Sequence, residues 1–356
     1  MNVLEDFVLN FSMKGKNNYS WNLIQMNKTE NSEIYIYCGT NRLDNNDIKI
    51  VKQIKIDKDK FEDKEYIYHI LKEFNLFFSL KIYNYFLKEI FILISEDENY
   101  LYLIINENVV SLKKLILSKI YNYLDNKYLV KWIIYQITFG LHILHSNNII
   151  HHDIKLSNIF IDSEGGIKIN GFESAIFKNQ KSYQYTLPYS APEILIGNII
   201  IDEKIDIWSL GIIIIELYLK KDLFLYKKDI KNREDQLYLI LEMLYGIKKE
   251  KFSINDLINI LNGNINNNIE FKIEQKILDQ IQDKDAIFLL NHLLNFNPKE
   301  RFTAKQILNS DYLKEFNGID SLNIKPIEFI IDNDEISKNK LEKQNFIELI
   351  KNIICK

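Results

Sequence analysis

The sequence is poor in the residues that mark cross-links, metal sites and sharp turns. It contains two cysteines, four prolines and eleven glycines in 356 residues. Cys38 and Cys355 lie near opposite ends of the chain, with no CxxC or histidine spacing around them. This pattern argues against a disulfide framework and against a zinc site. The first residues also lack a basic segment followed by an apolar run, so no signal peptide is visible. We therefore expect an intracellular protein, cytoplasmic or nuclear.

Long apolar runs and an excess of basic charge are missing as well. The richest apolar run, Ile207 to Leu219, is interrupted by Glu216. It is shorter than the ~20 apolar residues that span a bilayer, so it predicts a buried core helix and no membrane partner. The formal net charge is -4. Without a basic surface, nucleic acid is not an expected partner.

The spacing of apolar residues divides the chain into two parts. With 47% apolar content the chain can bury a sizeable core. From Tyr19 to Ile105 the apolar residues mostly alternate with polar ones, which predicts an antiparallel sheet with one exposed face. A single helical stretch, KFEDKEYIYHILKEF at 60–74, interrupts this pattern. The first part is therefore expected to be a small β lobe with one helix.

After Asn106 the period changes to that of helices. In KYLVKWIIYQITFGLHILH, apolar residues recur every three or four positions, with Asp125 as the expected N-cap and Asn147 at the end. Two short apolar pieces, NIFI and IKI, flank the turn DSEGG and predict a hairpin. Helices dominate from Asp206 to Phe316. The fold class is therefore α+β, with a small antiparallel β lobe and a larger, mainly α-helical lobe.

Four motifs in this order resemble those of the eukaryotic protein kinase family. They are LHSNNIIHHDIKLSNIFI, TLPYSAPEIL, DIWSLGIIIIELY and NPKERFTAKQILNSDYL. The resemblance implies a two-lobed kinase-like domain over 19–316, with lobes at 19–105 and 107–316. Residues 1–18 would form an N-terminal extension and 317–356 a C-terminal extension. The order and spacing of the four motifs make this resemblance specific.

Two further segments resemble the cyclin-dependent and mitogen-activated branch of the serine/threonine kinases. DQLYLILEMLYGI is followed by an Asn-rich insert, and the tail PIEFIIDNDEISKNKLEKQNFIELI is similar to the carboxy-terminal extension of mitogen-activated kinases. In the tail, Phe346, Leu349, Ile350 and Ile353 form an apolar stripe at helical spacing. We expect an amphipathic helix there that docks on its own kinase fold rather than on a partner.

The resemblance gives roles to three residues of HHDIKLSNIF. Asp153 matches the catalytic aspartate, which accepts the proton of the substrate hydroxyl, and Lys155 matches the lysine near the transferred phosphate. Asn158 matches a metal ligand. By the same resemblance, Glu193 and Arg301 match a buried structural ion pair, and Asp206 matches the residue that binds the backbone of the catalytic loop. His151 is expected to be a packed core histidine.

Three positions in or near this loop depart from the family pattern. His152 replaces an arginine that pairs with a phosphorylated activation segment, and imidazole lacks the bidentate fork of guanidinium. In KINGFESA, Gly171 stands where the metal-binding aspartate is expected, and Glu173 replaces a glycine. Mg²⁺ requires carboxylate oxygens in near-octahedral geometry. Neither Glu173, two residues away, nor the neutral amide of Asn170 is a good substitute.

The strand lobe departs from the family pattern too. The segment 26–35, where a phosphate-covering loop with three glycines is expected, contains no glycine and predicts an ordinary hairpin turn. In IKIVKQI, Lys52 matches the phosphate-pairing lysine, with Lys55 as a weaker alternative. Ile50 then stands where the family has alanine against the adenine ring, and its bulk would hinder the base. The glutamate that pairs with Lys52 is open, since an ungapped alignment gives Ile67 and a small shift gives Glu65.

Two functions are compatible with this combination. The first is a pseudokinase, a kinase fold that acts as a binding or allosteric module for a protein partner, with no cofactor expected. Losing one fixed electrostatic contact typically costs ~10²–10³ in rate, so several losses should leave little turnover. The second is an active serine/threonine kinase that uses ATP and Mg²⁺ through an unusual nucleotide site, since Asp153, Lys155 and Asn158 are all present.

Overall fold

The computed structural model divides the chain into two compact units, with the boundary between Val109 and Val110. This is close to the predicted boundary at Asn106. The structure describes residues 7–12, 18–28, 34–41, 48–55, 64–88, 90–94, 99–105, 109–118, 124–178, 180, 187–197, 201–221, 223, 232–261, 271–319 and 324. The predicted helix of the C-terminal extension lies outside these residues.

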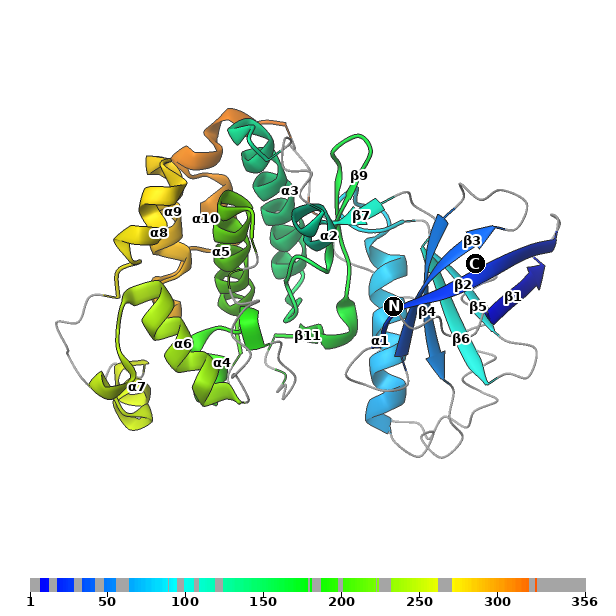
Figure 1. Ribbon diagram of the computed structural model, residues 1–356, viewed down its shortest axis with the longest axis horizontal. Helices are drawn as coiled ribbons and strands as arrows, with labels where there is room; N and C mark the ends of the chain where they lie inside the picture. The colour runs from blue at the N-terminus through cyan, green and yellow to red at the C-terminus, as the bar shows by residue number, and fades with distance from the viewer. Residues whose placement is uncertain are drawn as a thin grey trace. The chain divides into compact units, whose positions relative to one another are not determined.

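The first unit is built on a six-stranded antiparallel sheet with the order β1-β2-β3-β4-β6-β5 (Figure 1). Its strands are β1 (Phe7–Ser12), β2 (Asn18–Lys28), β3 (Ile34–Asn41), β4 (Ile48–Lys55), β5 (Ile90–Ile94) and β6 (Tyr100–Ile105). Strands β2 to β6 occupy the segments in which the alternating pattern predicts strands. Strand β1 lies within the predicted N-terminal extension, where its pairing with β2 adds an edge strand to the sheet.

One long helix, α1 (Lys64–Leu80), accompanies this sheet. It begins and ends later than the predicted helical stretch at 60–74. Most of its second half is buried, including Leu71, Phe74 and Leu76. Together with buried residues of β6, such as Leu101 and Leu103, these side chains supply the apolar core of the first unit.

The second unit consists mainly of helices. Its helices are α2 (Leu112–Leu117), α3 (Lys127–Ser146), α4 (Pro192–Ile196), α5 (Lys204–Leu219), α6 (Arg233–Tyr245), α7 (Ile254–Leu261), α8 (Gln275–Ile281), α9 (Lys284–Leu293) and α10 (Ala304–Leu308). Short 3₁₀ helices are η3 (Phe172–Ser174), η4 (Leu187–Tyr189), η5 (Lys249–Lys251), η6 (Pro298–Glu300) and η7 (Asp311–Phe316). Its strands are β7 (Val109–Ser111), β8 (Ile149–Ile150), β9 (Ile159–Asp162), β10 (Ile167–Ile169) and β11 (Ile176–Phe177).

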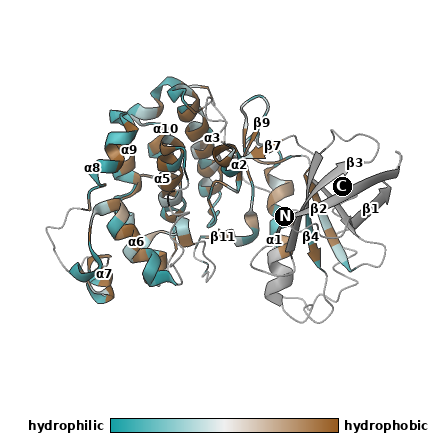
Figure 2. Ribbon diagram, viewed as in Figure 1, coloured by the Kyte–Doolittle hydropathy of each residue, from teal (hydrophilic) through white to brown (hydrophobic). Residues whose placement is uncertain are grey.

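Helix α5 forms the centre of this unit, as the apolar run predicts. Every residue from Ile205 to Leu217 is buried, and the helix contacts α3, α8 and α9. In Figure 2 most of the visible side of this helix has the colour of hydrophobic residues, which is typical of a helix enclosed by protein. No helix in the described part of the chain is long and apolar enough to cross a membrane.

Helix α3 begins one residue later than the sequence pattern suggests. The predicted N-cap was Asp125, but the side chain of Asn126 accepts hydrogen bonds from the backbone N–H groups of Tyr128 and Leu129. Both residue types cap helices well, so the pattern alone cannot separate adjacent candidates. The carboxylate of Asp125 instead pairs with Lys220. The helix ends at Ser146, with Asn147 as the C-cap, as expected.

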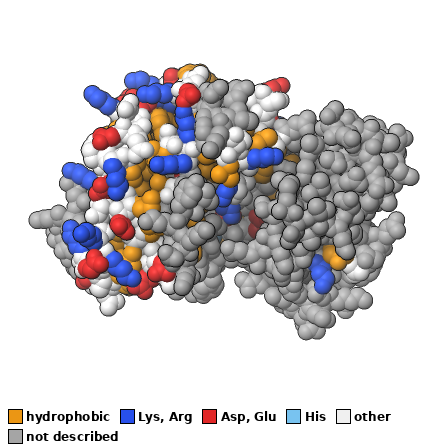
Figure 3. Space-filling view, in the orientation of Figure 1, with side chains coloured by type: hydrophobic (Ala, Val, Ile, Leu, Met, Phe, Trp, Pro, Cys, Tyr) orange, Lys and Arg blue, Asp and Glu red, His pale blue; other side chains and the backbone are white. Residues whose placement is uncertain are grey.

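The two units together confirm the predicted α+β fold class, with a small antiparallel sheet and one helix in one unit and mostly helices in the other. The face of the second unit drawn in Figure 3 carries acidic and basic side chains that lie among one another, with apolar side chains between them. The low net charge of the sequence is thus matched by a mixed surface on this face.

Candidate functional site

The hairpin of β9 and β10 brings together Asn158 and Gly171, which flank it in the sequence. Ile159 pairs with Ile169 across the hairpin, and the backbone N–H of Asn170 donates to the carbonyl of Asn158 over 2.9 Å. Since Asn158 directly precedes β9 and Gly171 closely follows β10, the hairpin places them side by side. The predicted hairpin NIFI-DSEGG-IKI is therefore the element that builds this half of the site.

The three residues of the predicted catalytic loop are in direct contact. Lys155 Nζ lies 2.7 Å from Asp153 Oδ2, and Asn158 Nδ2 donates to the same oxygen over 2.8 Å. Asn158 Nδ2 also donates to the backbone carbonyl of Asp153 over 2.8 Å. The carboxylate of Asp153 is therefore bound by a cation and an amide of its own loop.

Asp206, at the start of α5, holds the backbone of this loop. Its two carboxylate oxygens accept from the N–H groups of His151, at 2.9 Å, and His152, at 2.8 Å. The Nε2 of His145 lies 2.9 Å from Oδ2 of Asp206. Asp206 is 1% exposed, and burial alone would raise its pKa. The hydrogen bond and charge of His145, with further contributions from His151, outweigh burial and lower that pKa.

His151 is a packed core residue in the structure. It is fully buried, its ring lies 5.1 Å from that of Phe172, and its Nε2 donates to the carbonyl of Asn170 over 3.0 Å. Its Nδ1 accepts from the backbone N–H of Asp153 at 3.3 Å. Burial lowers the pKa of His151, against the opposing charges of Asp206 and Asp153. With one ring nitrogen donating and the other accepting, the neutral imidazole satisfies both contacts.

His152 has a left-handed backbone, with φ at 65°. This conformation costs a residue with a Cβ roughly 1–2 kcal/mol, so the surrounding contacts must hold it in place. The hydrogen bond from its N–H to Asp206 is one such contact. The side chain is partly exposed. Where the family pattern has an arginine, this chain therefore has an imidazole on a left-handed backbone.

Gly171 also adopts the left-handed region, with φ 88° and ψ 52°, and it is buried. A Cβ at this position would lie 2.5 Å from Asn158 Nδ2. Glu173 lies in η3, two residues further on, and is partly exposed. Within the described residues, no group of three or more His, Cys, Asp or Glu side chains gathers in a way that could hold a metal ion.

The side chains around Gly171 do not provide the ligands that a magnesium ion prefers. Position 171 offers no carboxylate, and Asn158 supplies only a neutral amide, whose Nδ2 donates to the carboxylate of Asp153. Mg²⁺ prefers carboxylate and water oxygens in near-octahedral geometry. The described contacts of this loop pair Asp153 with Lys155 and with Asn158.

Lys52 forms an ion pair within the first unit, and its partner corrects the sequence prediction. Lys52 Nζ lies 2.8 Å from Glu73 Oε1 and 2.9 Å from Oε2. The side chains are only 12% and 4% exposed. The sequence prediction gave Ile67 or Glu65 at the position that pairs with Lys52, but the partner of Lys52 is Glu73, further along α1. Glu73 lies in the helical stretch that the sequence predicts, so an alignment that allows a gap between β4 and α1 could have placed it opposite Lys52.

The other strand-lobe predictions fall on residues that the structure describes only in part. Ile50 lies two residues before Lys52 in β4 and pairs with Cys38 and Ile105 in the backbone register, but its side chain is outside the described part. Strands β2 and β3 form an antiparallel pair in the region of the glycine-free segment, with a register shift between Gln25 and Asn27. Residues 29–33 between these strands are outside the described part, so the predicted turn stays a prediction.

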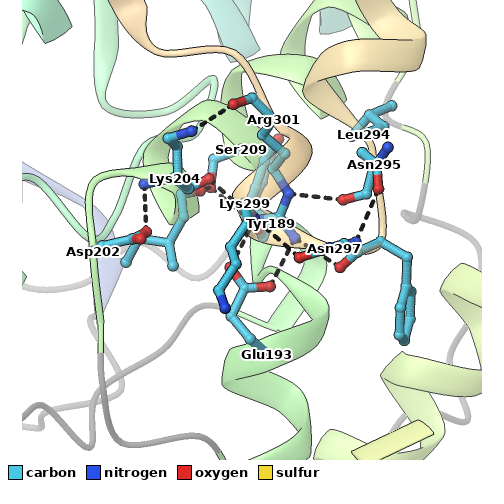
Figure 4. A network of polar contacts seen from close by, with 12 residues as sticks. Tyr189, Glu193, Asp202, Lys204, Ser209, Leu294, Asn295, Asn297, Lys299 and Arg301 are labelled. Atoms are coloured by element: carbon cyan, nitrogen blue, oxygen red, sulfur yellow. Dashed lines mark hydrogen bonds and ion pairs between the residues drawn. The ribbon is translucent and has the colours of Figure 1, made fainter. Parts of the chain in front are cut away.

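Glu193 and Arg301 form a buried, bidentate ion pair in the second unit (Figure 4). Arg301 Nη1 lies 2.6 Å from Glu193 Oε1, and Nη2 lies 2.7 Å from Oε2. The guanidinium also donates to the carbonyls of Asn295, Lys204 and Phe296, at 2.8, 3.2 and 3.3 Å. This network connects the start of α4 to the segment before α10.

Two contacts hold the segment before α4 on helix α5. The hydroxyl of Tyr189 donates to Glu216 Oε2 over 2.8 Å, and the hydroxyl of Ser209 donates to the carbonyl of Tyr189 over 2.9 Å. Glu216 is fully buried. The sequence shows Glu216 only as an interruption of an apolar run, and nothing in the pattern indicates that Tyr189 is its donor.

Comparisons with known proteins agree with these features. The family model described as "Protein kinase domain" matches residues 35–313. The chain is 31% identical over 198 residues to "Mitogen-activated protein kinase HOG1" of Colletotrichum orbiculare, covering 53% of this chain and 53% of that protein. It is 34% identical over 194 residues to "Serine/threonine kinase NLK" of Caenorhabditis briggsae, covering 52% of this chain and 29% of that protein. The chain thus spans about half the length of its curated HOG1 relatives, or less for NLK.

Proposed function

The chain belongs to the eukaryotic protein kinase family, and on this premise we propose that it is a catalytically impaired pseudokinase that acts as a binding or allosteric module. The observation that carries the proposal is Gly171. In this family the metal-bound aspartate at this position helps to neutralise the charge of the transferred phosphate. Here the position has no side chain, and the neighbouring amide of Asn158 fills the space instead.

The second candidate is an active serine/threonine kinase with an unusual nucleotide site. Two observations favour it. The ion pair of Lys52 and Glu73 is formed, and such a pair orients the lysine that contacts the phosphates in active kinases. Asp153 and Lys155 are also in contact at the candidate catalytic loop. We rank this candidate second because neither pair supplies the missing metal carboxylate.

A phosphate-transfer assay separates the two candidates. The full chain is incubated with radiolabelled ATP and a general protein substrate, in parallel with Mg²⁺ and with Mn²⁺. We expect no transfer above that of the Asp153→Ala variant, since the metal-binding carboxylate is absent at Gly171. Transfer that disappears in Asp153→Ala would show an active kinase and overturn the pseudokinase proposal.

Nucleotide binding is measured separately by thermal unfolding with ATP, with and without Mg²⁺. A ligand at 100 times its Kd stabilises the folded state by about 2.7 kcal/mol. The pseudokinase proposal predicts a weak shift or none, and no added effect of Mg²⁺. The Lys52→Ala variant is the control, because any specific shift should depend on the lysine paired with Glu73.

The finer assignments are also proposals. The relatives named as mitogen-activated kinases support a place in or near that branch. A protein partner, rather than nucleic acid, is the expected ligand, because the sequence has a net charge of -4. We propose an intracellular protein, cytoplasmic or nuclear. A pull-down with the full chain, compared with the 1–337 truncation, tests whether the C-terminal extension recruits the partner.

A further inference from the structure

The side chain of Asn158 lies where a side chain at position 171 would have to be. An ideal Cβ on Gly171 would stand 2.5 Å from Asn158 Nδ2, 2.6 Å from its Cγ and 3.0 Å from its Oδ1. Favourable contacts between carbon atoms lie at ~3.5–4.0 Å, so these distances are strong overlaps. In this conformation Asn158 therefore occupies the volume of a Cβ at position 171.

The amide of Asn158 is held in this position from several sides. Its Nδ2 donates both to the carbonyl and to the carboxylate of Asp153. Its backbone N–H donates to the carbonyl of Lys155, and its own carbonyl accepts from Asn170. Moving the amide away would break two side-chain hydrogen bonds, one of them to a charged acceptor. Such bonds are roughly twice as strong as neutral ones, so the side chain does not yield freely.

We infer that Asn158 is a positioning residue that fills the space beside Gly171 and holds the carboxylate of Asp153 in an arrangement that is complete without a metal ion. This inference rests on the proposed function, because it assigns to Asn158 a structural role in place of metal binding. It predicts that positions 158 and 171 are coupled. With Asn158 in this conformation, a side chain at 171 should cost less stability when the side chain at 158 is smaller.

The first test compares two glycines with similar left-handed φ angles. Gly171 and Gly197 have φ of 88° and 92°, so Gly→Ala introduces similar backbone strain at each. A Cβ on Gly197 would meet nothing within 4 Å, whereas one on Gly171 would overlap Asn158. We expect Gly171→Ala to lower Tm by about 2–4 °C more than Gly197→Ala does. Equal losses at the two positions would overturn the inference.

The second test repeats the comparison in chains with a smaller residue at 158. In Asn158→Ala and Asn158→Ser backgrounds, the excess loss from Gly171→Ala should disappear, while the loss from Gly197→Ala stays the same. This coupling is read within each background, so any stability lost through Asn158 itself cancels. If Gly171→Ala does not fold alone, recovery of folding in these backgrounds is the expected result. An excess that persists would overturn the inference.

A third measurement asks directly whether Asn158 binds metal. In protein labelled with ¹⁵N-asparagine, the NH₂ signals of Asn158 are identified by their loss in Asn158→Ala. We expect them to move in Asp153→Ala, which removes one acceptor, and to stay in place when ATP and Mg²⁺ are added. Movement that appears when Mg²⁺ is added to a sample that already contains ATP, and not with ATP alone, would show metal ligation and overturn the inference. Phosphate transfer is measured independently, so failure of this inference and failure of the proposed function are distinguishable.

Discussion

Removal of one partner of the Glu193–Arg301 pair should strongly destabilise the second unit. Both side chains are almost completely buried, at 4% and 0% exposure. Breaking a buried ion pair by removing one partner typically costs ~3–5 kcal/mol, because the other charge is left buried and uncompensated. A whole domain is stable by only ~5–15 kcal/mol, so a single substitution here removes a large share.

The two partners are not equivalent. Without Glu193, the guanidinium of Arg301 keeps its hydrogen bonds to the carbonyls of Asn295, Lys204 and Phe296. It also keeps its position 5.0 Å from the ring of Trp208. Without Arg301, the carboxylate of Glu193 loses the partner of both its oxygens, and the three carbonyls lose a donor. We therefore expect Glu193→Gln near the lower end, about 3 kcal/mol, and Arg301→Met near the upper end, about 5 kcal/mol.

Urea unfolding followed by tryptophan fluorescence measures both values. Trp132 and Trp208 report on the second unit, and a Trp21→Phe background removes the signal of the first unit. The double variant Glu193→Gln/Arg301→Met should lose less than the sum of the single losses, because neither charge is then left alone. A loss below ~1 kcal/mol for Glu193→Gln is the value of an exposed pair and would refute the reasoning.

Three further predictions concern other parts of the described structure. Tyr189→Phe removes a donor to the buried carboxylate of Glu216 and should lower the free energy of unfolding in urea by about 1.5–3 kcal/mol. Tyr245→Phe removes a donor to the neutral carbonyl of Leu294 and should lower it by about 0.5–1.5 kcal/mol. Equal losses would contradict the assignment of a charged acceptor to Tyr189. Burial lowers the pKa of His151, so on acidification the unfolded chain binds a proton at this residue before the folded chain does. The contribution of the neutral His151 to stability should be fully present above pH ~6.5, the unfolded pKa, and should be lost as the pH falls through the folded pKa. The slope is at most ~1.4 kcal/mol per pH unit. His151→Phe should remove most of this slope, leaving the smaller contribution of half-buried His142, and an unchanged slope would refute the explanation. Glu73→Ala should destabilise the first unit by about 3–5 kcal/mol, measured by the fluorescence of Trp21, whereas Glu65→Ala, the partner suggested by alignment, should have a smaller effect.

Local pattern was sufficient for most of the fold. The alternating pattern located the strands, although β6 is buried on both faces from Leu101 to Ile105 where one exposed face was expected. The apolar run of α5 likewise indicated a buried helix. Strand β1 was not predicted, because residues 1–18 were expected to form an extension outside the domain; the structure pairs it with β2. Asp125 was predicted as the N-cap of α3 in place of Asn126 because aspartate and asparagine are about equally favourable N-caps.

The candidate site was predictable where a residue's role depends on the motif around it. Asp153, Lys155 and Asn158 have fixed spacing on one loop, and the structure brings them into contact. Glu73 was missed because its relation to Lys52 depends on the length of the connection between β4 and α1, which no local pattern determines. The position of Asn158 against Gly171 was also not visible, since it depends on how the β9–β10 hairpin pairs.

The residues that match the kinase pattern and those that depart from it differ in what they contact. Lys52, Arg301 and Asp206 bind other groups of the same chain, so they stabilise the fold in the absence of any ligand. A metal-binding carboxylate at position 171 would contribute only when metal and nucleotide are bound, because a ligand stabilises the folded state only in proportion to its occupancy. The described hydrogen bonds from Asn158 to Asp153 form without that carboxylate. The pair of Lys52 and Glu73 stabilises the first unit, and the corresponding pair of active kinases also orients a phosphate-binding group. Its presence thus argues for a retained fold and does not by itself argue for retained catalysis.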